Sequence, residues 1–262
     1  MKLLFIGDVV GRPGREVLEN NLPLLEQEFN IDFTIINGEN ASGGFGMDLK
    51  AYDMMSAAGG DAFTMGNHTF DNRKIFDFID RKENIVRPLN LTPAAPGQGM
   101  RRFRLKNGDS LVIINFVGRA YSKLSLDCPF KKMEEILSDL SLEDTAIFVD
   151  FHGDATSEKV CFGHHFDGRV SAVCGTHTHI QTADEKILSR GTAYITDAGM
   201  TGAYDSCLGM GKEASISKFI SLKHTPMKPA PGERQINGVV IELGEDHKAR
   251  SIQRINRIYP EN

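Results

Sequence analysis

The chain has 262 residues, of which 40% are apolar, 25% are charged and ten are proline. This composition is typical of a globular protein, and it excludes an intrinsically disordered chain, a collagen-like repeat and a coiled coil. The length allows one large domain or two small ones. Because the proline-rich patches at 88–96 and 226–231 do not separate two complete cores, we expect a single domain over residues 1–262.

Thirty Lys and Arg residues against 35 Asp and Glu residues give a net charge of −5, so no basic excess is present to bind nucleic acid non-specifically. No stretch approaches the ~18–20 consecutive apolar residues of a membrane-spanning helix, and Asp8 interrupts the apolar start of the chain. We therefore expect a cytoplasmic protein without a membrane segment. The four cysteines have no CxxC spacing, and we expect reduced, mostly buried thiols at Cys128, Cys161, Cys174 and Cys207.

Short apolar runs recur along the chain and predict strands that are covered on both faces. These runs are residues 3–6, 33–36, 62–65, 111–117, 146–151, 170–174, 193–195 and 239–243. Between the early runs we expect three helices, at 15–22 (after Pro13 and before Pro23), at 48–58 with Asp48 as cap, and at 72–82 with Asn72 as cap. Strands that alternate with helices indicate an α/β fold.

The second half of the chain carries hairpin signals. Residues 101–106 and 110–117 flank an Asn107-Gly108 turn, and residues 186–189 and 192–195 flank Arg190-Gly191. Residues 238–243 and 250–258 are predicted to form a further pair of strands.

Polar side chains follow five of the predicted strands at the point where each strand ends. They are Asp8, Glu39, Asn40, Asn67, His68, His152, His177 and His179. Because the carboxyl ends of strands in an open α/β sheet share one edge, we expect these side chains to gather there. Hard oxygen donors mixed with several imidazoles suit Fe, Mn or Zn better than Ca or Mg.

Each of these residues also has a simpler interpretation. A single Asp after a strand often caps a turn or helix, and a single Asn-His pair often only bonds a loop. The pair His177 and His179 is more specific, because two imidazoles one residue apart point the same way from an extended segment. The remaining histidines lie in polar context and are expected to be exposed: His164, His165, His224 and His247.

Two glycine-rich segments, 43–46 and 209–211, follow neither the dinucleotide nor the phosphate-loop pattern. The first lacks the GxGxxG spacing, and in the second Glu213 occupies the position of the Ser or Thr that binds magnesium. We expect both to be tight turns that let the backbone approach the site.

The motifs Gly-Asp at 7–8, Gly-Asn-His at 66–68 and Gly-Thr-His-Thr-His at 175–179 resemble the signatures of dinuclear metallophosphoesterases. The chain departs from the general pattern at Val10, where a histidine is usual, and at Glu39, where a bridging aspartate is expected. Both departures are similar to one branch, the bacterial YmdB-like 2′,3′-cyclic-nucleotide 2′-phosphodiesterases. The resemblance runs from Met1 to about Ile258.

The resemblance implies a four-layer α/β/β/α sandwich with two mixed sheets flanked by helices. It also implies two metal ions per subunit, Fe or Mn or both, with Zn as an alternative. One ion would be held by Asp8, Glu39, Asn40 and His179, and the other by Glu39, Asn67, His152 and His177. Glu39 would bridge the ions, and His68 would lie just outside them as proton donor.

The implied reaction is hydrolysis of 2′,3′-cyclic nucleotides to 3′-nucleotides by attack of a metal-bridging hydroxide. Two alternatives stay open. The same metals would serve a phosphomonoesterase or a 3′,5′-cyclic-nucleotide phosphodiesterase, and a metal-binding regulatory protein would act through RNA-processing partners. The expected partner is a small cyclic nucleotide or phosphate ester, and the family resemblance makes a homo-oligomer plausible.

Overall fold

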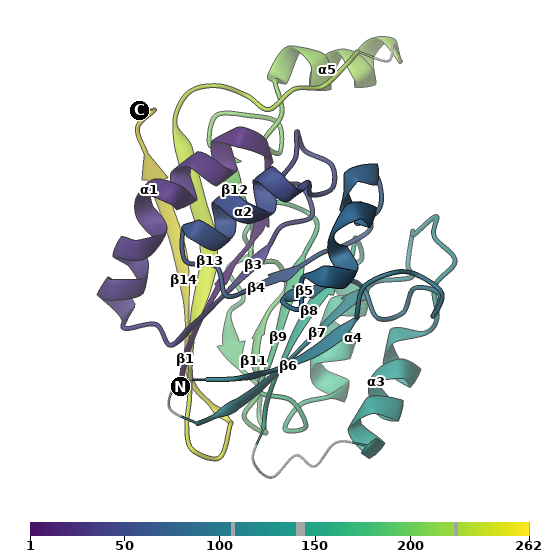
Figure 1. Cartoon of the computed structure of the whole chain (residues 1–262), viewed down its shortest axis with the longest axis vertical. Helices are drawn as coiled ribbons and strands as arrows, with labels where there is room; N and C mark the ends of the chain where they lie inside the picture. The colour runs from purple at the N-terminus through teal and green to yellow at the C-terminus, as the bar shows by residue number, and fades with distance from the viewer. Residues whose placement is uncertain (106–107, 140–144, 223–224, 262) are drawn as a thin grey trace.

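The computed structural model describes residues 1–105, 108–139, 145–222 and 225–261, and it stacks two β-sheets between helices (Figure 1). The first sheet has eight strands among the described residues. In spatial order they are β2 (Asp8–Val9), β12 (Met200–Ala203), β13 (Arg234–Leu243), β1 (Lys2–Ile6), β3 (Phe33–Asn37), β4 (Ala62–Thr64) and β5 (Ile85–Val86), with β14 (Ala249–Tyr259) paired to β13. β1, β3, β4 and β5 run parallel, whereas β13 is antiparallel to β1.

The second sheet has six strands within the described part of the chain. Their order is β10 (Lys186–Ile187), β11 (Ala193–Ile195), β9 (Ala172–Thr176), β8 (Ala146–His152), β7 (Ser110–Val117) and β6 (Met100–Arg104). The central strands are parallel and the two edge strands antiparallel, so this sheet is mixed as well.

Helices cover the outer faces of the two sheets. These helices are α1 (Gly11–Phe29), α2 (Leu49–Ala57), α3 (Pro129–Asp139) and α4 (Thr156–His165), with 3₁₀ helices η1 (Arg73–Asp77) and η2 (Ile79–Arg81) nearby. A further helix, α5 (Lys212–Ser221), has no buried residue. In Figure 1, α1 and α2 lie against the first sheet, α3 and α4 lie beside the second, and α5 projects from one end. Among the described residues no helix combines the length and apolar character needed to cross a membrane.

Alternating side chains along each central strand separate the core into layers. Leu4 and Ile6 of β1 pack in a cluster with α1 and α2, whereas Leu3 and Phe5 face the second sheet. The Phe5 ring lies 4.9 Å from the ring of Phe148 on β8. On the far side of the second sheet, Val112 and its neighbours pack with α3 and α4. These three layers of apolar contact confirm the predicted α/β/β/α sandwich.

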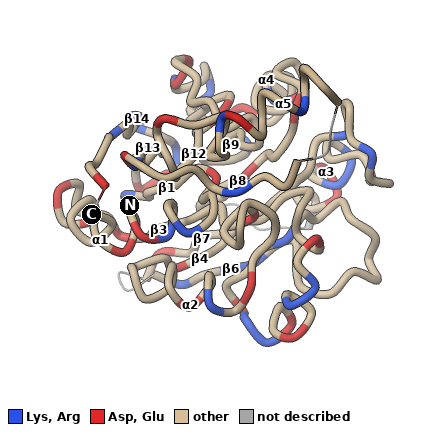
Figure 2. Tube along the Cα trace, turned by 90° about the horizontal axis from the view of Figure 1, so that it is seen from above, with Lys and Arg blue, Asp and Glu red and all other residues tan. Residues whose placement is uncertain are grey.

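The predicted strands are all present, with boundaries shifted by at most a few residues, and the three predicted strand pairs are confirmed. Asn107 of the first turn and His224 lie outside the described residues. His164 and His165 are exposed as expected, whereas His247 is half-buried. Acidic and basic residues are scattered over the whole trace in Figure 2, in keeping with the small net charge.

The cysteine prediction was wrong about burial. All four cysteines are free thiols, but Cys174 on β9 is the one that is buried. Cys161 is exposed, and Cys128 and Cys207 are half-buried. The three less buried thiols lie outside the sheets, in α4 and in connecting segments, where the apolar runs of the sequence do not extend.

Two helix predictions were also wrong in part. The helix expected at 15–22 begins at Gly11 and continues through Pro23 to Phe29. Glu19 and Pro23 both face solvent, so water can bond the carbonyl that loses its intrahelical donor. The helix expected at 72–82 is two 3₁₀ helices separated at Phe78, although Asn72 caps the first by accepting from the N–H of Lys74.

Candidate metal centre

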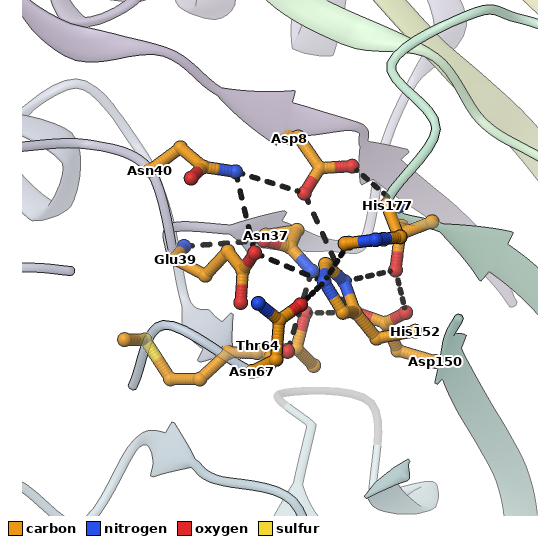
Figure 3. Close-up of polar contacts among 12 residues, drawn as sticks. Asp8, Asn37, Glu39, Asn40, Thr64, Asn67, Asp150, His152 and His177 are labelled. Atoms are coloured by element: carbon orange, nitrogen blue, oxygen red, sulfur yellow. Dashed lines mark hydrogen bonds and ion pairs between the residues drawn. The ribbon is translucent and has the colours of Figure 1, made fainter. Parts of the chain in front are cut away.

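The polar residues that follow the strands gather at one end of the sandwich (Figure 3). Asp8, Glu39 and Asn40 follow β1 and β3 of the first sheet, and Asn67 and His68 follow β4. The second sheet contributes His152 at the end of β8 and two histidines after β9. Asp8, Glu39 and His152 have no exposed surface, and Asn40 is 3% exposed.

Three of these side chains converge on the amide of Asn40. Its Nδ2 lies 3.1 Å from His179 Nε2, 3.4 Å from Asp8 Oδ1 and 3.4 Å from Glu39 Oε1. An amide nitrogen carries two protons and can donate two hydrogen bonds, but three acceptor atoms converge on this one. Rotating the amide by 180° places its oxygen beside the lone pairs of His179, Asp8 and Glu39. Four atoms that offer lone pairs to one point form an arrangement that can bind a cation.

A second group converges on the Nε2 atom of His152. That nitrogen lies 2.9 Å from Glu39 Oε1, 3.0 Å from Asn67 Oδ1 and 2.9 Å from His177 Nδ1. Ligand atoms of Glu39, His152 and His177 lie within 4.8 Å of one another, close enough for one ion. Glu39 belongs to both groups, since its Oε1 contacts the amide of Asn40 and the ring of His152.

Buried carboxylates make this a candidate site for cations. Burial opposes ionisation of Glu39, but the positive charge of His152 lowers the pKa of its carboxyl to about 2. Burial likewise disfavours a charged His152, yet the carboxylates of Glu39 and Asp8 raise its pKa to about 9. The two fully buried carboxylates need compensating positive charge, which divalent ions would supply.

Hydrogen bonds behind the site fix the tautomer of His152. Its Nδ1 lies 2.9 Å from the hydroxyl of Thr176, and that hydroxyl donates to Asp150 Oδ1 at 2.6 Å. The Thr176 oxygen therefore accepts from Nδ1–H of His152, which leaves the lone pair of Nε2 directed at Glu39 in the neutral ring. Burial raises the pKa of Asp150 to about 6, although the charge of His152 and the hydrogen bonds that Asp150 accepts both act to lower that pKa.

The loop that follows β9 is strained. His177 has φ 99° and His179 has φ 65°, so the segment is not extended as expected from the sequence, and the two imidazoles join different groups. Left-handed backbone at non-glycine residues costs on the order of 1–3 kcal/mol each. A buried ion pair holds the loop in place: Lys159 Nζ lies 2.8 Å from Asp197 Oδ2, which accepts from the N–H and hydroxyl of Thr178.

His68 lies beside both groups rather than within them. Its backbone N–H donates to Glu39 Oε2 at 3.1 Å, and its Nδ1 lies 2.7 Å from Asp71 Oδ2. Its side chain is 28% exposed. His68 lines two cavities that open from the site, of about 510 and 320 Å³. Sequence reasoning did not single out Asp71, although it follows His68 by the three residues of one turn.

Comparison with known proteins reveals relatives that match nearly the whole chain. A curated 2′,3′-cyclic-nucleotide 2′-phosphodiesterase of Bacillus subtilis (strain 168) is 48% identical over 97% of this chain and 96% of its own length. A crystal structure described as a novel phosphatase of Mycoplasma pneumoniae is 34% identical with a TM-score of 0.93, covering 100% of this chain and 94% of that one. A hypothetical protein of Thermus thermophilus is 35% identical with a TM-score of 0.92, and each chain is covered in full.

The family model described as "YmdB-like protein" matches residues 4–255. The match includes every residue of both groups around Asn40 and His152. The chain belongs to the YmdB-like protein family.

Proposed function

We propose that this chain is a metal-dependent phosphoric diester hydrolase that converts 2′,3′-cyclic nucleotides to 3′-nucleotides. The observation that carries the proposal is the convergence of carboxylate, amide and imidazole donors on two adjacent points that share Glu39. The name of the Bacillus subtilis relative, at 48% identity, supports the choice of substrate.

Asp8, Glu39, Asn40 and His179 would hold one ion, and Glu39, Asn67, His152 and His177 the other. These two sets of side chains fit metal ions for two reasons. Each set brings together more lone pairs than there are protons to share between them, and the buried carboxylates need positive charge nearby. Bound divalent ions would lower the pKa of a coordinated water and neutralise the phosphoryl oxygens. Fe and Mn are the proposed metals, and Zn also accepts this mixture of donors.

His68 is the proposed proton donor. The carboxylate of Asp71 accepts from Nδ1–H, which orients the ring and leaves Nε2–H free to donate to the leaving group. A water that has given one proton to solvent attacks phosphorus as hydroxide, the bond to the ribose 2′ oxygen breaks, and that oxygen takes the proton from Nε2. Solvent then returns a proton to Nε2. General acid assistance of this kind contributes ~10²–10⁴-fold.

The remaining expectations are part of the same proposal. We place the protein in the cytoplasm, which suits four free thiols, with a small-molecule substrate and assembly as a homo-oligomer. Action through RNA-processing partners is the alternative role. A phosphomonoesterase is the alternative reaction, because the Mycoplasma pneumoniae structure is described as a phosphatase.

The test is an assay of the manganese-loaded protein on 2′,3′-cyclic AMP, 3′,5′-cyclic AMP and 3′-AMP, with products separated by chromatography. We expect 3′-AMP from the first substrate and little turnover of the other two. His68→Ala should lower kcat by ~10²–10⁴-fold while the metal content stays unchanged. Preferred hydrolysis of 3′-AMP would favour the phosphomonoesterase, and no turnover of any substrate would favour a regulatory role.

A further inference from the structure

The larger cavity beside the site, about 510 Å³, has two unlike walls. Its polar wall consists of groups already assigned to the metals and the proton donor, including Glu39, His68 and His177. Five apolar side chains line the remainder: Phe45, Leu208, Met210, Phe219 and Met227. The proposed chemistry uses none of these five.

Two segments of the apolar wall, the 43–46 turn and residues 208–210, are fixed to each other and to the site. Gly44 has φ +97°, and a Cβ there would lie 1.9 Å from Met210 Cε, so only glycine lets the 43–46 turn pack on Met210. The carbonyl of Leu208 lies 3.2 Å from His179 Nδ1, so it accepts from the ring of a proposed metal ligand. These two segments of the wall therefore keep a fixed position relative to the proposed metal ligands.

Phe45 is the aromatic member of this wall nearest to the chemistry. Its ring lies 5.1 Å from the ring of His68 in an edge-on arrangement, and the residue is 41% exposed. A half-exposed phenyl ring over a cavity gains free energy when a flat apolar ligand covers it. The volume is within the ~300–1,000 Å³ range of small-molecule sites.

We infer that this cavity is a nucleobase subsite and that Phe45 is the ring on which the base stacks. The inference rests on the proposed function and adds that the protein recognises the nucleoside as well as the cyclic phosphate. With the phosphate at the metals, the base would lie against the apolar wall beside His68, in the cavity that Ser215 and Lys218 also line. The smaller cavity, of about 320 Å³, suits a base less well, because Asp71 and Lys123 line it in addition to Asp154, which lines both cavities.

The test compares 2′,3′-cyclic AMP with ethylene phosphate, which has the same five-membered cyclic diester and no base. Stacking of a base on an aromatic ring is worth ~1–3 kcal/mol, which at 1.4 kcal/mol per factor of ten is about 5- to 150-fold. Phe45→Ala should lower kcat/KM for 2′,3′-cyclic AMP by that factor, through KM, and leave ethylene phosphate within about twofold. Phe45→Tyr should retain most of the activity on both substrates.

A matched control is Phe76→Ala, since Phe76 is also an exposed phenylalanine (51%) and stacks on Phe70, and it lines neither cavity of the site. It should leave both substrates unchanged. If Phe45→Ala lowered kcat/KM equally for the two substrates, Phe45 would act through His68, and the subsite alone would be overturned. Unchanged kcat/KM for both substrates would overturn the subsite as well. A wild-type protein that hydrolyses neither substrate would overturn the proposed function and the subsite with it.

Discussion

Asn40 brings an uncharged amide to a point where two carboxylates and an imidazole already meet. Val10 occupies the place where the general metallophosphoesterase pattern has a histidine, so the proposed ion beside Asp8 depends on Asn40 for its remaining ligand. Asn40→Ala should therefore weaken that ion selectively. We expect the metal content of the dialysed protein, measured by elemental analysis, to fall from about two to about one per chain.

Asn67→Ala is the companion variant, because Asn67 belongs to the other group of donors, and it should also leave about one ion per chain. Asn20→Ala, on the exposed face of α1, should keep both. Two equivalents in purified Asn40→Ala would contradict the assignment of Asn40 as a ligand.

The positions of the proposed ligands could be predicted from the sequence because each follows an apolar run, and strand ends share an edge. The residues that support them could not. Asp150 and Thr176 lie inside strands, and Lys159 lies in a helix. Some of their partners come from the opposite sheet or from a distant loop, for example Asp150 with Asn37, which is 113 residues away, and Lys159 with Asp197. Contacts between stacked layers leave no periodic pattern in one chain.

At the scale of elements, strands were easier to predict than helices. A short apolar run is enough to predict a buried strand. The apolar residues 75, 78 and 79 would share one face in an α-helix and in a pair of 3₁₀ helices, so their spacing does not distinguish the two structures. The end of α1 differs from the prediction because Pro23 lies inside the helix and does not terminate it. Leu22 and Leu25, buried on either side of it, hold the helix against the first sheet.

Pro23 gives a direct prediction about α1. A proline in a helix interior costs ~3 kcal/mol, partly offset by ~0.4–1 kcal/mol because proline also restricts the unfolded chain. Pro23→Ala should thus raise the free energy of unfolding by ~1–3 kcal/mol, measured by urea denaturation. Pro13→Ala is the control, since Pro13 lies in the first turn, where no intrahelical donor is required, and it should bring no gain. An unchanged or lower stability for Pro23→Ala would show that α1 is already adapted to the proline.

At the scale of the whole molecule, the two sheets are joined in two different ways. Apolar side chains such as Phe5 and Phe148 fill most of the space between them. At the end near the candidate metal centre, the buried carboxylate of Asp150 on β8 joins the sheets through hydrogen bonds. It accepts from Asn37 Nδ2 at 2.9 Å and Thr64 Oγ1 at 2.5 Å, both on the first sheet, and from Thr176 on β9.

Asp150 thereby connects both groups of proposed ligands. Asn37 Oδ1 accepts from the backbone N–H of Glu39 at 3.1 Å, and Thr176 contacts His152. One carboxylate thus positions a proposed bridging ligand from one sheet and an imidazole from the other. The alignment of the two sheets and the geometry of the site depend on the same buried group.

Asp150→Asn tests this arrangement. The amide keeps one acceptor oxygen where three donors converge and adds N–H groups of its own, so at least one buried donor loses its partner at ~1–3 kcal/mol each. We expect the free energy of unfolding of the chelator-treated protein, from urea denaturation, to fall by ~2–4 kcal/mol. Thr64→Val removes one bond without stranding a buried donor and should cost only ~1 kcal/mol. If the two variants were equally stable, the sheets would be held by their apolar layer alone, and Asp150 would have no part in joining them.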